Sequence, residues 1–281
     1  MTRRGTPVAW PFRVWLGAEL LFGLAAVMSV GRKPADTAEN FAWPIEPVVM
    51  AALLGAFYFA VAPMFVVAMA VRRWEMVRVM VLPAAAFTTA ELLATIIHWD
   101  RFSVGTGPFY LWLASYLLPP PIYVAAYLWH QRRAGLSTPE KPLSSRLRRA
   151  LVIVGGLLTV EAIVALIHPR YFADAFPWAL TPLTTRVLSG FLLAIGLMLL
   201  SVACENDLDR VRVLSPTFIL LLPAVTFQVT RYWDEVDTGS FRFWTILAYL
   251  LGLCALGVYL ARGTWRETFV GLPAAGSGRR R

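Results

Sequence analysis

The sequence carries little charge for its length. Charged residues make up 15% of its 281 residues, whereas hydrophobic residues make up 58%. A soluble globular domain has about 25% charged and about 45–50% apolar residues, because it needs a polar surface. This chain lacks the residues to build such a surface, which excludes an ordinary water-soluble domain.

Residues that form disulfides and metal sites are also scarce. The two cysteines, Cys204 and Cys254, fall in or at the end of apolar runs at different depths, so neither a disulfide nor a thiolate metal site is expected. His98 and His168 share an outer helix end, where a bis-histidine haem or a metal site is conceivable. Interfacial histidine is ordinary, however, and no pattern of supporting partners accompanies the pair. We therefore predict no metal and no cofactor.

Motifs of soluble enzyme chemistry are missing. The chain has no phosphate-binding glycine loop, no His-Glu-x-x-His and no Gly-x-Ser-x-Gly. Residues 105–108 form a glycine-proline turn into a helix, which is too weak a signal for phosphate binding. A membrane enzyme would have Asp100 and Asp234 as its only plausible acid pair. The sequence therefore disfavours an enzyme. A membrane enzyme is retained as a third hypothesis.

What the chain does have is a series of apolar runs of about 20 residues, the length that crosses about 30 Å of hydrocarbon as a helix. These runs predict an all-α polytopic membrane protein with eight transmembrane helices. The expected ranges are 14–30, 48–71, 77–97, 108–129, 150–167, 183–203, 211–229 and 243–261. Three consecutive prolines, Pro119, Pro120 and Pro121, must kink or interrupt the fourth helix, because proline removes a backbone donor.

The basic residues lie mostly in alternate loops. Of the 26 lysines and arginines, 19 fall in the two termini and the connectors of one side, and six fall in the loops of the other. Because basic loops remain in the cytoplasm, the N- and C-termini are predicted to be cytoplasmic. The net charge of +9 could also suggest nucleic acid, but no charged stripe with interleaved aromatics appears. The predicted partner is the lipid bilayer, with no nucleic acid.

The sequence contains an internal repeat. Landmarks recur in the same order: Trp43 with Trp178, Gly55 with Gly190, Trp99 with Trp233, and Asp100 with Asp234. Because each copy has four spans, an even number, both copies are expected to cross the membrane in the same sense, as parallel repeats about an axis along the membrane normal. A repeat without tight two-fold contact is the alternative. The predicted division is a first four-helix repeat (1–135), a basic cytoplasmic linker (136–149) and a second four-helix repeat (150–281).

Two tryptophan-aspartate corners, Trp99-Asp100 and Trp233-Asp234, end the third and seventh helices on the outer side. Tryptophan at a helix end ordinarily belongs to the aromatic belt at headgroup depth. An aspartate there faces the unfavourable end of the helix dipole, so each is expected to have a partner, such as a neighbouring arginine or a loop amide. The alternative, which assigns these corners a function, is a duplicated ligand site on the outer face.

Three carboxylates fall inside expected spans: Glu19, Glu91 and Glu161. Since a charge at mid-bilayer costs at least about 2.5 kcal/mol, such residues are candidates for ligand binding. Glu19 and Glu161 lie on the first helix of each repeat, where they are potentially equivalent. Glu91 has no twin, and we predict that it pairs with Gln228 or Arg231. The alternative is a protonated Glu91 hydrogen-bonded to a carbonyl.

Three stretches resemble segments of uncharacterised multi-pass membrane proteins of high-GC bacteria such as actinobacteria. They are residues 41–57, residues 176–184 and the motif His98-Trp99-Asp100-Arg101-Phe102. The resemblance covers most of the chain and implies placement in a bacterial inner membrane. It implies no known activity and no site residues.

Two functional hypotheses follow. The first is a binding or transport module for a small or lipidic molecule, with a site between the two repeats and access from the outer face. The intramembrane acids, the broken fourth helix and the parallel repeat favour it. The second is a non-catalytic accessory or scaffold subunit that binds other membrane proteins, favoured by the short loops. A polar cavity between the halves would favour the first, and a packed interface the second.

Overall fold

The computed structural model describes residues 5–134, 138–262 and 265, and this part of the chain is all-helical. Within these residues, eight apolar helices are long enough to cross a membrane, which makes the chain a multi-pass membrane protein. In chain order, the spans are α1 (Trp10–Ala26) with η1 (Val27–Gly31), α3 (Val48–Ala70), α4 (Arg78–Ile97), α5 (Gly107–Leu117) with α6 (Pro119–Gln131), α7 (Ser145–Ile167), α9 (Pro182–Glu205), α10 (Leu208–Val211) with η5 (Arg212–Leu214) and α11 (Ser215–Arg231), and α12 (Phe241–Leu260).

Short helical turns join the spans at both ends of the bundle. They are η2 (Pro34–Asp36), α2 (Thr37–Asn40), η3 (Trp74–Met76), η4 (Trp99–Arg101), α8 (Pro169–Ala173) and η6 (Trp233–Glu235). As predicted from the three prolines, the fourth span is interrupted: α5 ends at Leu117 and α6 begins at Pro119. Proline fits the first turn of α6, where the missing N–H would have no partner in any case.

The fifth span begins earlier than the sequence predicts. The side chain of Ser144 accepts a hydrogen bond from the Leu147 N–H at 3.3 Å, so α7 begins at Ser145 rather than at residue 150. The last residues of the predicted linker 136–149 are therefore helical. The prediction was wrong because Arg146 and Arg149 look like loop residues, whereas arginine is a good helix former that can extend a span beyond the hydrocarbon.

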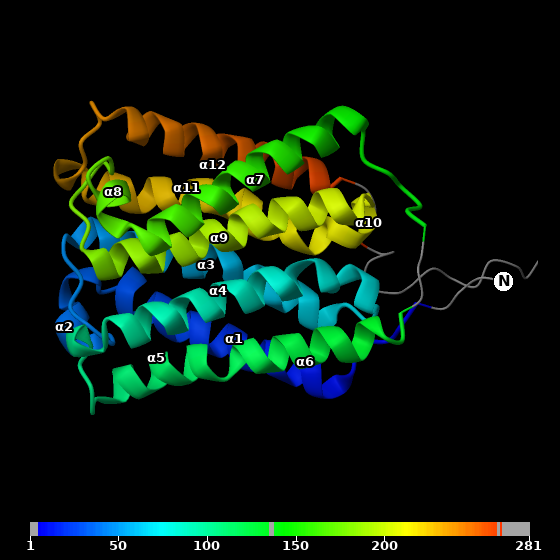
Figure 1. The fold of residues 1–281 in the computed structure, drawn as a ribbon, viewed down its shortest axis with the longest axis horizontal. Helices are drawn as coiled ribbons and strands as arrows, with labels where there is room; N and C mark the ends of the chain where they lie inside the picture. Colours follow the sequence, from blue (N-terminus) through cyan, green and yellow to red (C-terminus); the bar gives the residue numbers. More distant parts are fainter. Residues whose placement is uncertain (1–4, 135–137, 263–264, 266–281) are drawn as a thin grey trace, which may run out of the picture.

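The spans form two groups that lie side by side (Figure 1). We call the spans of residues 10–131 the first half and those of residues 145–260 the second half. Within the first half α1 packs on α3 and α4 packs on α5 and α6, while within the second half α7 packs on α9 and α11 packs on α12. Between the halves α3 packs on α11 and α4 packs on α9. The most buried spans, α3 and α9, therefore lie nearest the junction.

Both tryptophan-aspartate corners lie at the same end of the bundle, which we call the corner end and which holds α2 and α8 in Figure 1. The Ser103 N–H donates to the Ala42 carbonyl at 2.8 Å, just beyond η4. The Asp237 N–H donates to the Pro177 carbonyl at 2.7 Å, just beyond η6. Each corner is thus tied by the same kind of backbone bond to the segment that enters the second span of its half.

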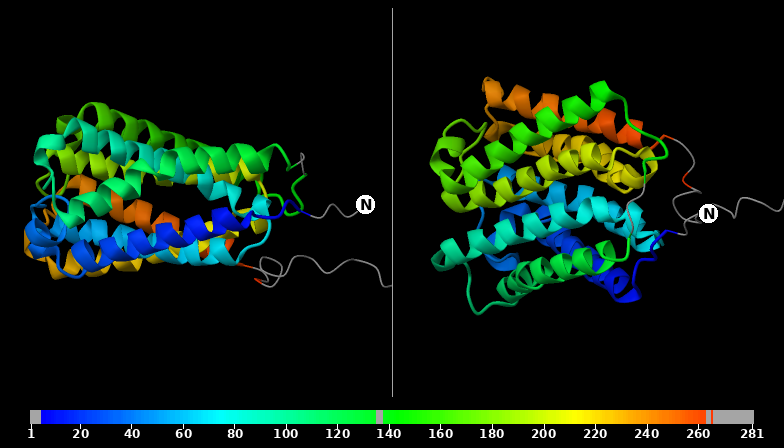
Figure 2. Two further views of the ribbon diagram at one scale, coloured as in Figure 1. Left: turned by 90° about the horizontal axis from the view of Figure 1, so that it is seen from below. Right: turned by 45° about the vertical axis from the view of Figure 1, so that its right-hand side comes forward.

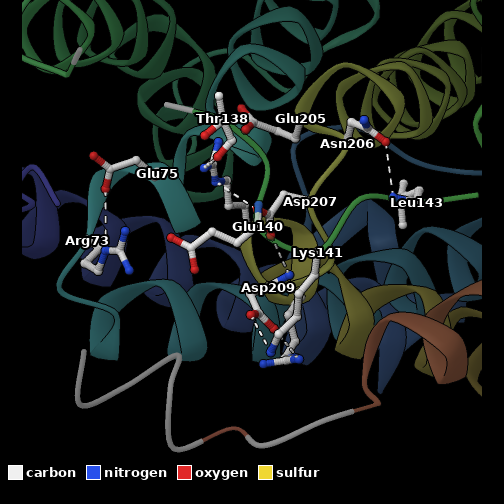
Figure 3. Close-up of polar contacts among 12 residues, drawn as sticks. Arg73, Glu75, Thr138, Glu140, Lys141, Leu143, Glu205, Asn206, Asp207 and Asp209 are labelled. Carbon is white, nitrogen blue, oxygen red and sulfur yellow. Dashed lines mark hydrogen bonds and ion pairs between the residues drawn. The ribbon is translucent and has the colours of Figure 1, made fainter. Parts of the chain in front are cut away.

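The opposite end, which we call the linker end, is where α6 ends and α7 begins (Figure 2), and Figure 3 shows the polar contacts there. The Asp207 carboxylate accepts from the Glu140 N–H at 2.7 Å, and the Asn206 side-chain oxygen accepts from the Leu143 N–H at 3.2 Å. The Lys141 ammonium lies 2.8 Å from the Asp209 carboxylate. The described part of the linker is therefore clamped onto the turn between α9 and α10.

Candidate functional site

The junction between the halves is closed by aromatic rings. The Phe191 ring of α9 lies 4.9 Å from the Phe57 ring of α3 and 4.6 Å from the Phe87 ring of α4, measured between centroids. Within the first half, α3 also approaches η1 closely, since a Cβ atom at Gly55 would fall on the backbone of Gly31. The junction between α3, α4 and α9 is thus filled by aromatic rings.

Glu91 is buried in this junction, but it does not have the predicted partners. The Arg231 guanidinium donates to the Gln228 side-chain oxygen at 2.8 Å, and the Gln228 amide donates to the Gly31 carbonyl at 3.2 Å. Glu91 instead faces Gly190 of α9, is fully buried, and has no hydrogen-bond partner for either oxygen. The pairing prediction was wrong because α11 packs on α3, whereas α4 packs on α9.

Two apolar cavities flank the packed junction, one in each half. The first-half cavity has a volume of about 240 Å³ and is bordered mainly by the spans of that half, together with Phe191, Ala194 and Met198 of α9. The second-half cavity has a volume of about 320 Å³ and is bordered mainly by the spans of that half, together with Leu53 and Phe57 of α3. The sequence places a single site between the repeats, whereas these cavities lie to either side of the junction.

The first-half cavity contains polar groups without partners. Glu19 of α1 is 9% exposed, and its Oε1 atom is buried without a hydrogen bond. The hydroxyl of Tyr123 on α6 is also buried without a hydrogen bond, although Trp15 lies beside it. The remaining wall is mostly apolar and includes the aromatic side chains of Phe22, Phe41, Phe65, Phe87, Trp112 and Phe191. A carboxylate and a hydroxyl therefore face an apolar, aromatic space.

A pair of tyrosines extends this polar group towards the junction. The hydroxyls of Tyr58 on α3 and Tyr116 on α5 are 2.5 Å apart, and both residues line the first-half cavity. The Tyr58 ring lies 5.3 Å from the Phe191 ring of α9, which places the pair beside the junction. Sequence reasoning missed all three tyrosines, since nothing in an apolar run tells a cavity-lining tyrosine from a packed one.

Glu161 occupies a different position from Glu19. It forms an ion pair with Arg242 of α12 at the wall of the second-half cavity. At about 1.5 Å per residue, Glu161 lies about 9 Å from the end of its span at Ile167, whereas Glu19 lies about 18 Å from the end of its span at Gly31. The two glutamates are therefore not equivalent in depth or in partners.

The corner residues are exposed. Trp99 and Trp233 are 45% and 51% exposed, and they pack edge-on against Phe109 and Phe243. Asp100 pairs with its neighbour Arg101 at 3.3 Å, as one of the sequence alternatives predicts, and Asp234 is exposed. Neither aspartate lines a cavity described above. Trp233 alone of these residues borders one, the second-half cavity.

His98 holds the two halves together at the corner end. Its Nε2 atom is 2.7 Å from the Arg186 guanidinium, which also donates to the Leu166 carbonyl at 2.9 Å. Since a guanidinium can only donate, the imidazole accepts in its neutral form. His98 therefore acts as a hydrogen-bond acceptor between α4 and α9.

This contact predicts a pH dependence. Partial burial, and next the Arg186 charge, lower the pKa of His98 below its ordinary value, although Asp100 opposes the shift. The unfolded chain then takes up the proton first, so the stabilisation is complete above about pH 6.5 and is lost as the pH falls further. We expect the melting temperature in detergent to fall between pH 7.5 and pH 5.5, and the His98→Gln variant to show a smaller fall. Equal pH profiles would contradict the assignment.

Comparison of the chain with family models, with curated proteins and with solved structures finds no match.

Proposed function

We propose that this chain is a two-repeat protein of a bacterial inner membrane that binds, and in a transport cycle moves, a small amphiphilic molecule with a cationic head. The site is the first-half cavity, and Glu19 is the counter-ion of the ligand. One observation carries the proposal: the Oε1 atom of Glu19 is buried without a hydrogen bond and borders an apolar cavity with several aromatic side chains in its wall.

The contacts support a parallel repeat. Corresponding pairs of helices pack together in the two halves, and the contact of α3 with α11 has its counterpart in the contact of α9 with α4. The two corners are tied by corresponding backbone bonds. A cytoplasmic location of the termini is supported by the basic residues of the linker end, such as Arg78, Arg148 and Arg212.

The chemistry of the cavity favours a cationic ligand. A carboxylate removed from water without a partner is costly, and a cation is its complement. Aromatic faces such as those of Trp112 and Phe87 add cation–π attraction, worth about 2 kcal/mol when desolvated. The volume of about 240 Å³ is below the range of about 300–1,000 Å³ typical of drug-sized ligands, so the ligand is small.

The lining also indicates the route of access. Asn40, Phe41, Gly107 and Pro108 border the cavity at the corner end, while Tyr123 borders it at greater depth. The packed junction closes the cavity towards the centre of the bundle. Entry is therefore proposed from the outer face, beside the interrupted fourth span.

Octylamine binding to the purified protein tests the proposal. We expect octylamine to bind more tightly than octanol, and the Glu19→Gln variant to lose about tenfold or more in octylamine affinity, because a charged hydrogen bond contributes about 1.5–3 kcal/mol. Calorimetry measures both affinities, with Glu46→Gln, at an exposed glutamate that lines neither cavity, as the control. Equal affinities of the parent protein for the amine and the alcohol would contradict the proposal. An unchanged octylamine affinity of the Glu19→Gln variant would contradict it as well.

A second function, that of a non-catalytic scaffold subunit, is favoured by the tight aromatic packing of the junction. Purification from native membranes in a mild detergent separates the two functions. A scaffold subunit brings a stoichiometric membrane-protein partner with it, whereas a binding module is recovered alone.

A further inference from the structure

The second-half cavity has an ion pair in its wall. Arg242 is the second residue of α12, at headgroup depth at the corner end, and its guanidinium reaches Glu161, about 9 Å inside the end of α7. The Arg242 guanidinium also lies 4.8 Å from the centroid of the Phe172 ring, over its face. Both side chains are about three-quarters buried, with 23% and 28% exposed. The cavity therefore presents one positive and one negative group side by side.

A second group in the wall of this cavity is a donor that lacks an acceptor. The indole nitrogen Nε1 of Trp178, in the segment before α9 at the corner end, is buried without a hydrogen-bond partner, and Trp178, which is 7% exposed, lines the cavity. Most of the remaining wall is apolar, including Leu158, Leu192 and Leu250. A buried N–H without an acceptor is costly, so the cavity favours an occupant that carries an acceptor near its head.

We infer that the second-half cavity binds a phospholipid with a zwitterionic amine-phosphate head, of the phosphatidylethanolamine class. The ammonium meets Glu161, the phosphate meets Arg242, an ester carbonyl accepts from Trp178, and an acyl chain fills the apolar space. Such a head matches both members of the ion pair, whereas an anionic head such as phosphatidylglycerol leaves Glu161 opposed by like charge. This site is separate from the first-half cavity and does not depend on the proposed function.

The first half offers a matched control for the indole. Trp43 aligns with Trp178 and is also buried with Nε1 unpartnered, but it lines neither of the two cavities. Replacing either tryptophan with phenylalanine removes an N–H and retains an aromatic ring. A general packing defect would affect both variants, whereas loss of a lipid contact would affect only Trp178→Phe.

The experiment is lipid binding to the delipidated full chain in detergent, measured by native mass spectrometry with phosphatidylethanolamine and phosphatidylglycerol of equal acyl chains. We expect the parent protein to retain the zwitterionic lipid about tenfold better, and Glu161→Gln to lose this preference, because the ammonium is what distinguishes the two heads at this site. Both lipids carry a phosphate and ester carbonyls, so Arg242→Gln and Trp178→Phe should retain both lipids less well, while Trp43→Phe should retain them as the parent does. Glycerophosphoethanolamine, the head without chains, should not compete, which separates a membrane lipid from a free phosphate ester.

Equal retention of the two lipids by the parent protein would overturn the inference, and this comparison needs no variant to fold. A Trp178→Phe variant that behaves like Trp43→Phe would overturn the role of the indole. Full competition by the chain-free head would overturn the lipid as the occupant.

Discussion

Replacing Arg78 with glutamine is expected to destabilise the protein by about 3 kcal/mol, because the loss of one partner leaves a largely buried charge uncompensated. Arg78 is the first residue of α4, and its Nη2 atom donates to the Glu205 carboxylate at the end of α9 at 2.6 Å. The side chains are 14% and 12% exposed. This pair connects the halves at the linker end, so its loss weakens the junction. Reversible unfolding in mixed detergent measures the change.

Two controls separate this effect from a general loss of charge. Arg101→Gln breaks the pair with Asp100, whose side chains are 72% and 75% exposed, and it should leave stability nearly unchanged. The double variant Arg78→Leu/Glu205→Leu removes both charges, so it should recover much of the lost stability. A double variant no more stable than Arg78→Gln would contradict the assignment of the effect to an uncompensated charge.

Replacing Gly55 with alanine is expected to destabilise the protein by about 3 kcal/mol, at the upper end for overpacking. The added Cβ would meet the Cα and N atoms of Gly31 and lie 3.1 Å from the carbonyl carbon of Val30. These are backbone atoms of the neighbouring span, which cannot rotate away as a side chain can. Small residues that allow such close approach are typical of helix contacts in membranes. Thermal unfolding in detergent is the measurement.

Gly156 is the matched control, because a Cβ there meets nothing within 4 Å, and alanine is expected to be neutral or slightly stabilising. At Gly190 the Cβ would meet the Glu91 carboxylate first, which is the end of a flexible side chain. Gly190→Ala should therefore cost less than Gly55→Ala, and Glu91→Ala in the same chain should relieve part of the cost. Equal melting temperatures for Gly55→Ala and Gly156→Ala would show that the spans are further apart than described.

Hydropathy and loop landmarks were enough to predict the eight spans. The described part of the chain confirms all eight, together with the break before Pro119. The bounds were less accurate where polar residues begin a helix, as at Ser145. Both corners fall at one end of the bundle because an even number of spans separates them. These features depend on position along the membrane normal, which composition encodes directly.

The partners of the buried acids could not be predicted in the same way. Hydropathy gives the depth of a residue but not the direction in which its side chain points, and a span such as α3 is apolar on every face. Glu91 and Gln228 were therefore paired by depth alone, although they face different helices. The unpartnered Tyr123 and the Tyr58–Tyr116 pair depend on contacts between spans distant in sequence.

The parallel arrangement of the two halves is tested most directly by single cysteines at Asp100 and Asp234. The native Cys204 and Cys254 are both free, so they are first replaced by alanine. Intact cells are then treated with a membrane-impermeant thiol reagent. Two halves inserted in the same sense, with cytoplasmic termini, predict labelling from outside at both positions. Labelling of one position from outside and of the other only after lysis would contradict that arrangement.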